Sequence, residues 1–289
     1  MEDTARLFEA HRGLLRSIAY RMLGSLADAE DIVQETWLRL SRAGLAAVGN
    51  PRSWLVTVAS RLCLDRLKSA RAQREEYVGV WLPEPYPAED HGGAKRGEID
   101  ESVSIALMLV LEKLSPQERA GFLLHEVFGF SFDEIARVLE KTPPACRKLV
   151  SRARARVRAG RPRFKASRED HETLLSRFLE ACRAGEMAPL LELLHPAAEF
   201  HSDGGGKAIT APKVLDDPAL IAKFFVRIAR ETRPSGGFRE TKAAFFNGAP
   251  GLLIYQGGRP ITALALEIAE GKIIRIFAHR NPDKLRLFS

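Results

Sequence analysis

Residues 114–157 read LSPQERAGFLLHEVFGFSFDEIARVLEKTPPACRKLVSRARARV, and this stretch predicts a helix-turn-helix. At 115–118 and 131–134 a serine is followed three residues later by a glutamate, which is the capping box that begins a helix. The pattern predicts helices over Glu118–Phe128 and Phe132–Glu140. A third helix begins where the cap Thr142 is followed by Pro143, and Ala145, Leu149 and Val150 can pack inward on it. The short turn before this last helix, and the basic character of the helix itself, are typical of a unit that enters the major groove of DNA.

Charge is distributed unevenly along the 289 residues, whose formal net charge is +7. Residues 141–165 contain ten Lys and Arg and no acid, whereas residues 26–40 contain four acids and one base. A basic helix indicates nucleic-acid binding, and an acidic helix face indicates a basic protein partner. The alternative for the basic block is a solvated helix face.

The composition is that of an ordinary globular protein, and the length favours two or more domains. No run of 18 apolar residues predicts a membrane span, and the charged N-terminus lacks the apolar core of a signal peptide, so we expect a cytoplasmic protein. Cys63, Cys146 and Cys182 are too far apart for a disulfide framework or a metal site, and we expect them to be buried. We expect no cofactor and no metal.

The pattern of helix signals divides the chain. Helix caps and apolar spacing predict about six helices in the first 160 residues, and residues 80–103 have the Pro, Gly and acidic composition of a linker. After residue 167 the pattern predicts two helices over 170–194 and a third over 218–231. From 238 onward it predicts strands, with hairpin turns at Asn247-Gly248 and Glu270-Gly271. Helices followed by a mostly antiparallel sheet argue for an α+β domain.

Two blocks resemble the extracytoplasmic-function (ECF) sigma factors of the sigma-70 family. Residues 6–40, RLFEAHRGLLRSIAYRMLGSLADAEDIVQETWLRL, resemble sigma region 2, and residues 114–157 resemble region 4. The two blocks lie in the order of that family, with an acidic linker between them. The resemblance implies two all-α sigma domains, with region 2 over 1–78, a linker over 79–103 and region 4 over 104–162.

In that family the acidic segment of region 2 docks on the clamp helices of the polymerase β′ subunit, while the β flap is the other polymerase contact that the resemblance implies. The matching positions here are Asp28, Asp31, Gln34, Glu35 and Trp37. Acids at helical spacing suit a basic partner helix, although an ordinary amphipathic helix would show the same pattern.

The block GNPRSWLVTVASRLCLDRLKSARAQRE at 49–75 resembles the segment that reads and melts the −10 element of a promoter. A loop that holds an extruded base and a helix that faces the promoter are implied at Asn50, Pro51, Arg52, Arg61, Asp65, Arg66 and Lys68. Binding of a flipped base offsets part of the cost of unstacking without a nucleotide cofactor. Trp54 is a candidate stacking wedge, although its helical spacing with Leu55 and Val58 favours a core position.

The last helix of region 4 is implied to read the −35 element in the major groove. The matching residues are Arg147, Lys148, Ser151, Arg152 and Arg154, whose long donors suit guanine edges and phosphates. The double proline Pro143-Pro144 departs from this pattern, because it leaves fewer backbone donors for a phosphate at the start of the helix.

Residues 168–289 resemble a SnoaL-like, NTF2-like cone domain, in which a curved sheet wraps on helices around a pocket. The motifs WLPEP at 81–85, DGGGK at 203–207 and NPDKL at 281–285 are similar to those of ECF sigma factors with a fused extension of this kind. In that subgroup the extension regulates the sigma domains in place of a separate anti-sigma factor. The interdomain or regulatory residues implied are Trp81, Pro83, Asp203, Gly204, Gly205, Gly206, Lys207, Asn281, Pro282, Asp283 and Lys284.

The DGGGK stretch admits three interpretations. A phosphate-binding P-loop fails on spacing, because it requires glycine at position 201 and Ser or Thr at 208, where this chain has His201 and Ala208. A regulatory contact, a plain turn, and a ligand or catalytic loop that uses His201 with Asp203 remain open. These two residues stand two apart on a strand end and therefore share a face.

The leading interpretation is a transcription initiation factor that binds core RNA polymerase and promoter DNA and is not an enzyme. A small-molecule effector in the C-terminal pocket would shift docked and undocked populations by its differential affinity. Two alternatives remain: a pocket enzyme of the isomerase or cyclase type with a DNA-binding module, and a plain helix-turn-helix repressor. The acidic helix argues against the repressor, and the lack of a second carboxylate or metal set argues against the enzyme.

Overall fold

The computed structural model describes residues 2–87, 103–159, 166–232 and 240–288. The described chain forms two compact units. Residues 2–76 and 107–159 belong to the first unit, and residues 77–87, 103–106, 166–232 and 240–288 belong to the second. Region 2 and region 4 therefore form one unit, while the linker residues that the structure describes group with the C-terminal domain.

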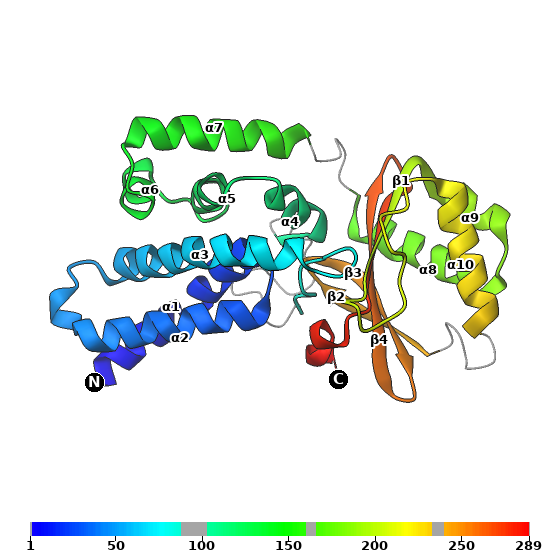
Figure 1. Cartoon of the computed structure of the whole chain (residues 1–289), viewed down its shortest axis with the longest axis horizontal. Coiled ribbons are helices and arrows are strands. Elements are labelled where there is room, and N and C mark those ends of the chain that lie inside the picture. Colours follow the sequence, from blue (N-terminus) through cyan, green and yellow to red (C-terminus); the bar gives the residue numbers. More distant parts are fainter. Residues whose placement is uncertain (1, 88–102, 160–165, 233–239, 289) are drawn as a thin grey trace. The chain divides into compact units, whose positions relative to one another are not determined.

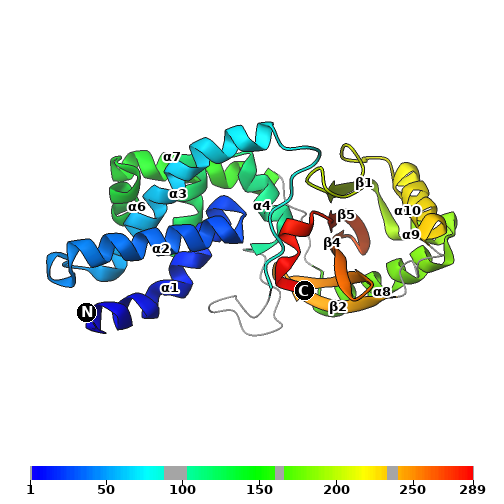
Figure 2. The same cartoon turned by 60° about the horizontal axis from the view of Figure 1, so that its bottom comes forward.

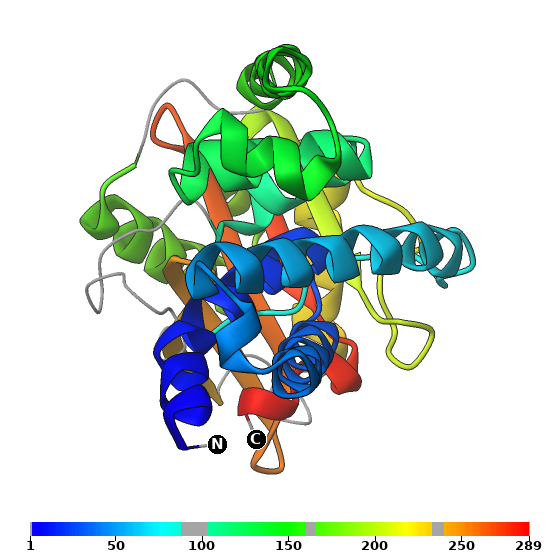
Figure 3. The same ribbon diagram turned by 90° about the vertical axis from the view of Figure 1, so that its left-hand side faces the viewer.

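The N-terminal part of the first unit consists of three long helices that pack on one another (Figure 1, Figure 3). They are α1 (Glu2–Leu23), α2 (Leu26–Ala43) and α3 (Pro51–Glu75), with a short 3-10 turn η1 (Leu45–Ala47) before α3. Ser25 caps α2, since its hydroxyl accepts from the backbone N–H of Asp28. Apolar side chains at helical spacing, such as Leu15 and Ile18, are fully buried between the helices.

Region 4 follows as four helices and a π-helical turn. The elements are α4 (Ile105–Glu112), α5 (Pro116–Phe122), η4 (Leu123–Val127), α6 (Phe132–Leu139) and α7 (Pro143–Ala159). Both predicted capping boxes are present, at Ser115 and at Ser131. A Cβ on Gly121 would lie 2.7 Å from Leu149 Cδ2, so the absence of a side chain there lets α5 approach α7 closely.

The predicted helix-turn-helix is confirmed, with two local differences. The helix expected over 118–128 begins at Pro116 and changes to π geometry at Leu123. On α7 the expected inward residue Ala145 is exposed, and Cys146 is buried in its place. The helical phase places position 146, rather than 145, on the face shared with Leu149 and Val150.

The C-terminal domain is an α+β fold with a five-stranded sheet in the order β1-β5-β4-β3-β2 (Figure 2). The helices are α8 (Arg168–Ala184), α9 (Met187–Leu193) and α10 (Pro218–Thr232). The strands are β1 (Leu194–Asp203), β2 (Thr241–Phe246), β3 (Ala249–Gln256), β4 (Arg259–Ala269) and β5 (Lys272–His279), and the 3-10 turns η6 (Pro282–Lys284) and η7 (Arg286–Phe288) follow.

The sheet is antiparallel except at one edge, where β1 pairs in parallel with β5. The sequence pattern predicts strands only from residue 238 onward, apart from a strand end near 201–203, so β1 extends the sheet by an earlier strand. The predicted hairpin turns at Asn247 and at Glu270 are both present with positive φ.

One face of the sheet packs on the helices through a continuous apolar core. Phe225 makes edge-to-face contacts there with Phe178 and Phe200, with ring centroids 5.0 and 5.1 Å apart. Alternation along β1 places Phe200 toward this core and Asp203 on the opposite face. All three cysteines are buried, as expected.

Candidate functional site

Asp203 ends β1 and is fully buried, yet its carboxylate has three donors. Oδ1 accepts from the Tyr77 hydroxyl at 2.5 Å, and Oδ2 accepts from the backbone N–H of Leu82 at 2.9 Å. Lys284 Nζ donates to Oδ2 at 2.7 Å. A buried carboxylate requires such partners, so this arrangement ties the linker to the end of the sheet.

Lys284 makes further contacts with the linker besides its bond to Asp203. Its ammonium also donates to the carbonyl of Leu82 at 2.5 Å. It lies 5.1 Å from the centroid of the Tyr77 ring and 4.7 Å from that of Trp81, which are cation–π distances. Only 8% of its side chain is exposed. We call Asp203, Lys284, Tyr77, Trp81 and Leu82 the linker anchor.

The glycines of DGGGK form a tight turn against the linker. Gly205 and Gly206 have φ of 56° and 70°, which glycine adopts without strain. A Cβ on Gly205 would lie 2.2 Å from Asn281 Nδ2 and 2.8 Å from the Tyr77 hydroxyl, and one on Gly206 would lie 3.4 Å from Val78. The carbonyl of Gly204 accepts from Lys207 N and Ala208 N and closes the turn.

The NPDKL motif meets the same turn. Asn281 Nδ2 donates to the Tyr77 hydroxyl at 2.9 Å, and its backbone N–H donates to the carbonyl of Asp203. Pro282 begins the turn η6 that carries Lys284. On the surface Lys207 binds Asp283, and this hydrogen bond is the main cause that lowers the pKa of Asp283.

A histidine and an asparagine hold the next part of the linker. His279 is buried at the end of β5, and its Nε2 lies 2.9 Å from the carbonyl of Pro83. Burial lowers the pKa of His279 to about 4. Asn247 bonds Tyr86 and Val103 through its side-chain amide. The structure thus brings together the three predicted motifs WLPEP, DGGGK and NPDKL in one unit.

Sequence reasoning missed Tyr77, Tyr86, Asn247 and His279. Asn247 was assigned to a hairpin turn, which is correct but incomplete, because nothing in an Asn-Gly pair indicates what the side chain contacts. Burial, more than the hydrogen bond to Asp203, raises the pKa of the Tyr77 phenol. The signal that existed was the aromatic content of 77–86, which is high for a linker.

His201 and Asp203 lie on the same face of β1, but their partners differ. His201 Nε2 is 3.1 Å from Glu199 Oε2, and Arg275 donates to both Glu199 and Glu267 at 2.9 and 2.6 Å. The Asp203 carboxylate instead accepts hydrogen bonds from Tyr77 and Leu82. The two residues therefore belong to a cross-strand ion network and to the linker anchor, respectively, and the contacts do not support a catalytic pair.

On α2 the predicted polymerase-binding residues divide into two groups. Asp31 and Gln34 are exposed, and Glu35 forms an ion pair with Arg39 at 2.9 Å. Trp37 packs on Phe8 with ring centroids 5.2 Å apart. Leu38, which the sequence analysis did not single out, is 45% exposed and follows Asp31, Gln34 and Glu35 at helical spacing.

Asp28, the fifth of these residues, faces the predicted −10 helix. It accepts from Arg66 Nε at 3.0 Å, and this hydrogen bond is the main cause that raises the pKa of Arg66. Asp65 pairs with Lys68 at 3.0 Å on the exposed side of α3. Asp28, a predicted polymerase-binding residue, and Arg66, a predicted DNA-binding residue, thus form an ion pair with each other.

Two further residues of the predicted −10 set, Arg52 and Arg61, contact region 4. Asn50 caps α3 by accepting from Ser53 N at 3.0 Å, with Pro51 in the first turn, and the Arg52 guanidinium lies 4.6 Å from the centroid of the Phe130 ring. Arg61 Nη2 donates to the carbonyl of Arg137 at 2.6 Å and forms an ion pair with Glu140 at 3.1 Å. These carbonyl and carboxylate oxygens lie at the negative end of α6.

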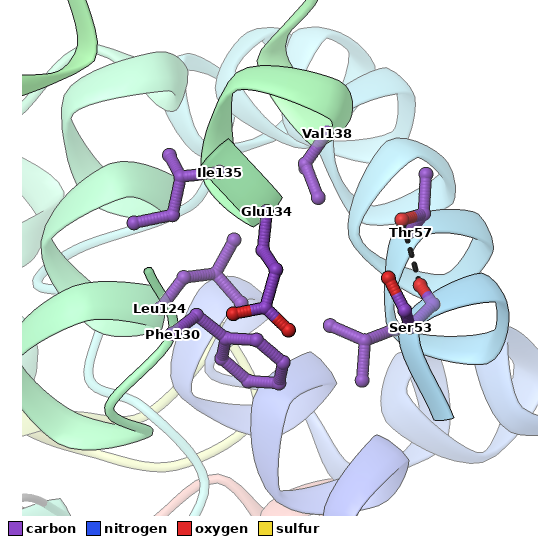
Figure 4. Close-up of a pocket in the computed structure, with 8 residues that line it drawn as sticks. Ser53, Thr57, Leu124, Phe130, Glu134, Ile135 and Val138 are labelled. Atoms are coloured by element: carbon purple, nitrogen blue, oxygen red, sulfur yellow. Dashed lines mark hydrogen bonds between the residues drawn. The ribbon is translucent and has the colours of Figure 1, made fainter. Parts of the chain in front are cut away.

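The contact between α3 and region 4 includes a pocket and a groove. Figure 4 shows Ser53 and Thr57 of α3 opposite Glu134 of α6, with Phe130 beneath them. A groove of about 460 Å³ lies nearby and is lined by Arg61, Leu64, Asp65, Lys68, Ser115, Pro116, Gln117, Val138, Leu139 and Glu140. Most of the α3 side of this groove is the predicted −10 surface.

Arg119 of α5 joins the two regions at a buried position. Its Nη1 donates to the carbonyl of Met22 near the end of α1 at 2.6 Å, and its Nε donates to the carbonyl of Leu111 at 3.0 Å. Glu112 lies 2.6 Å from the same guanidinium and balances its charge. A buried cation with a carboxylate and two carbonyl partners is well satisfied.

The predicted −35 residues share the solvent face of α7. Arg147, Lys148, Ser151 and Arg152 are exposed. Arg154 donates to Glu126 Oε1, with its Nε at 3.2 Å, and this interaction raises its pKa. The Arg147 guanidinium lies 5.7 Å from the centroid of the Phe132 ring, at the start of α6.

No helix among the described residues is both long and apolar enough to cross a membrane. The family model Sigma-70 region 2 matches residues 7–73, and Sigma-70, region 4 matches residues 104–157. The ECF RNA polymerase sigma factor SigJ of Mycobacterium tuberculosis is 39% identical over 292 residues, which cover 96% of this chain and 91% of that protein.

The probable ECF RNA polymerase sigma factor SigI of Mycobacterium tuberculosis is 33% identical and covers 98% of this chain and 95% of that protein. The crystal structure of Mycobacterium tuberculosis SigJ matches with a TM-score of 0.77 at 34% identity, over 96% of this chain and 97% of that one. The fold and these relatives define a sigma factor of the sigma-70 family. More narrowly, the chain belongs to the ECF RNA polymerase sigma factors.

Proteins of this family bind core RNA polymerase and promoter DNA and direct promoter recognition. Sigma factors are not enzymes, so the pocket-enzyme alternative is wrong. The plain repressor alternative is also wrong, because both sigma regions of the family are present and not the helix-turn-helix alone. The C-terminal region is an additional mixed α+β domain, as expected.

Proposed function

We propose that the C-terminal domain regulates sigma regions 2 and 4 from within the same chain by holding the linker between them. The observation that carries this proposal is the linker anchor, in which a buried Asp203–Lys284 ion pair binds both the N–H and the carbonyl of Leu82. A linker held in this way restrains the sigma regions, and its release frees them for polymerase and promoter. A separate anti-sigma factor is then not required.

We further propose that the C-terminal domain is a SnoaL-like, NTF2-like cone domain. A five-stranded sheet with three helices against one face agrees with this assignment. An effector that binds this domain would shift the balance between held and released linker by its differential affinity for the two states. The described side chains between the sheet and the helices are apolar, so an apolar effector suits this domain better than a charged one.

For polymerase binding we propose the exposed stripe of α2 formed by Asp31, Gln34, Glu35 and Leu38. The acids suit a basic helix of the β′ clamp, and Leu38 supplies an apolar centre at the same helical spacing. Trp37 supports the stripe through its packing on Phe8. Asp28 orients Arg66 and acts on the partner indirectly.

For promoter DNA we propose that residues of the −10 and −35 sets contact protein groups in the free chain and contact nucleic acid in the promoter complex. Arg52 and Arg61 lie against region 4, and Arg154 lies against Glu126. Each of these contacts has an exposed cation, and an exposed ion pair contributes at most about 1 kcal/mol. Phosphates therefore compete with them readily once region 4 moves away from α3.

The test of regulation compares Lys284→Met with Lys207→Met in the full chain. Both changes remove one ammonium group, but the first lies in the buried linker anchor and the second lies in an exposed ion pair with Asp283. We expect Lys284→Met to raise specific transcription by core RNA polymerase from a library of promoter fragments, and Lys207→Met to leave it near the wild-type level. Equal transcription by all three proteins would refute the regulatory role, and a decrease with Lys284→Met would refute restraint.

A further inference from the structure

Asn247 makes a set of contacts that its place in a hairpin turn does not require. It has φ of 49° and precedes Gly248, which explains the Asn-Gly pair between β2 and β3. Such a turn is satisfied by its backbone alone, and its side chains normally face solvent. The Asn247 residue is nevertheless 98% buried, with only 2% of its surface exposed.

The side-chain amide bonds two linker residues that are far apart in sequence. Oδ1 accepts from the backbone N–H of Tyr86 at 2.9 Å, and Nδ2 donates to the carbonyl of Val103 at 2.9 Å. The backbone N–H of Asn247 also donates to the carbonyl of Tyr86 at 2.8 Å. Tyr86 and Val103 are themselves fully buried, so these bonds are shielded from water.

The chemistry requires an amide. One group must accept from an N–H and donate to a carbonyl at the same time, and among the residues that tolerate a left-handed turn only asparagine does both with its side chain. Aspartate accepts but has no donor, and glycine has neither group. The identity of residue 247 is therefore set by the linker as well as by the turn.

We infer that Asn247 is a clasp that joins the two ends of the linker and shortens its reach; this rests on the proposed function of the C-terminal domain. Unclasped, residues 76–104 span at most about 100 Å between the end of α3 and the start of α4. With Tyr86 and Val103 held at one side chain, only residues 76–86 and 103–104 span this gap, which limits it to about 50 Å.

The shorter reach bears on polymerase and promoter binding. The −10 and −35 elements lie about 25 base pairs apart by their names, which is about 85 Å of B-form duplex. The clasped linker covers at most roughly half of this span, while release of Val103 adds up to about 60 Å of chain between positions 86 and 103 to the reach. Two modules bind together only when their linker spans both sites, so the clasp opposes simultaneous engagement of region 2 and region 4.

The test uses three variants of the full chain. Asn247→Gly keeps the turn and removes both side-chain bonds. Asn247→Asp keeps the acceptor for Tyr86 and removes only the donor to Val103. Gly257→Asn is the control, because Gly257 has φ of 57° in the β3–β4 turn and a Cβ there would meet nothing within 4 Å.

Hydrogen exchange of peptides from 77–87 and 103–112 reports the clasp, and equilibrium titration with core RNA polymerase reports its effect. We expect faster exchange in 103–112 for Asn247→Gly and Asn247→Asp, and binding to core that is at least about threefold tighter than for wild type. Gly257→Asn should match wild type in both measurements.

Unchanged exchange in 103–112 for Asn247→Gly would overturn the clasp, and so would faster exchange with wild-type affinity for core. Asp203→Asn separates this failure from failure of the proposed regulation, because it opens the linker anchor and leaves Asn247 intact. If Asp203→Asn alters affinity for core and Asn247→Gly does not, regulation stands and the clasp is wrong. If neither alters it, both are wrong.

Discussion

At the scale of single residues, the linker anchor depends on one buried ion pair. Removing one partner of such a pair leaves an uncompensated buried charge and costs about 3–5 kcal/mol. We therefore expect Asp203→Asn to speed hydrogen exchange in residues 77–87, because the buried Lys284 ammonium then loses its anionic partner. The double variant Asp203→Asn, Lys284→Met removes both charges, and we expect a smaller loss of C-terminal domain stability than the sum of the single changes.

A second prediction at this scale concerns pH. Burial holds His279 neutral with a pKa of about 4, against about 6.5 in an unfolded chain. Between these values the unfolded state binds more protons, so stability decreases as pH falls, by about 2 kcal/mol between pH 7 and pH 5. Asp203 and Lys284 are the charged groups that act on this ring, and they act in opposite directions.

The measurement is urea unfolding of the C-terminal domain at pH 7 and pH 5. We expect His279→Gln, which keeps a donor for the carbonyl of Pro83, to lose most of this pH difference. The attribution to His279 would be wrong if the variant showed the same difference as wild type.

Site residues could be predicted where they belong to a sequence motif. They could not be predicted where only a tertiary contact identifies them. DGGGK and NPDKL located Asp203 and Lys284, but the sequence did not indicate that the two side chains form an ion pair around Leu82. Lys207 and Lys284 could not be ranked from the sequence, since burial separates them and burial depends on the whole fold. A hairpin turn fully accounts for an Asn-Gly pair, so the sequence does not indicate that Asn247 also binds the linker.

At the scale of elements, Arg119 connects α5 to the end of α1. We expect Arg119→Met to lower the free energy of unfolding of the first unit by about 3–5 kcal/mol, because the carbonyls of Met22 and Leu111 and the carboxylate of Glu112 lose their donor. Arg119→Lys should recover part of this loss, since a lysine keeps the charge and cannot reach every partner.

The control is Arg156→Met, which removes an exposed guanidinium that binds Glu118. We expect a change of at most about 1 kcal/mol. Chemical denaturation of the three variants distinguishes the cases, and an equal loss for Arg119→Met and Arg156→Met would contradict the account of how α1 and α5 are joined.

The helices could be predicted because the capping residues at their ends are recognisable in the sequence. Ser115 and Ser131 form the expected capping boxes, and Asn50 caps α3. The π turn at 123–127 and the parallel pairing of β1 with β5 were not predictable, because both depend on packing between segments distant in sequence. The phase of α7 was misjudged by one position at Ala145, where a small apolar residue carries little information about burial.

At the scale of the whole molecule, the sequence divided the chain into two sigma regions, a linker and a C-terminal domain, and the compact units group these parts differently. Most of region 2 and region 4 shares one unit, whereas residues 77–87 and 103–106 belong with the C-terminal domain. These residues are the described part of the predicted linker together with the last two residues of region 2 and the first three of region 4. Composition marked the linker as polar and rich in proline and glycine. It did not reveal that Leu82 and Tyr86 are fully buried.

The central claim is that the C-terminal domain restrains the sigma regions through the linker. The most direct measurement is equilibrium binding of core RNA polymerase to the wild-type chain and to the double variant Asp203→Asn, Lys284→Met. Our account predicts tighter binding by the double variant, because the linker is no longer held while regions 2 and 4 are unchanged. Equal affinities, with hydrogen exchange that confirms a released linker in the variant, would contradict it.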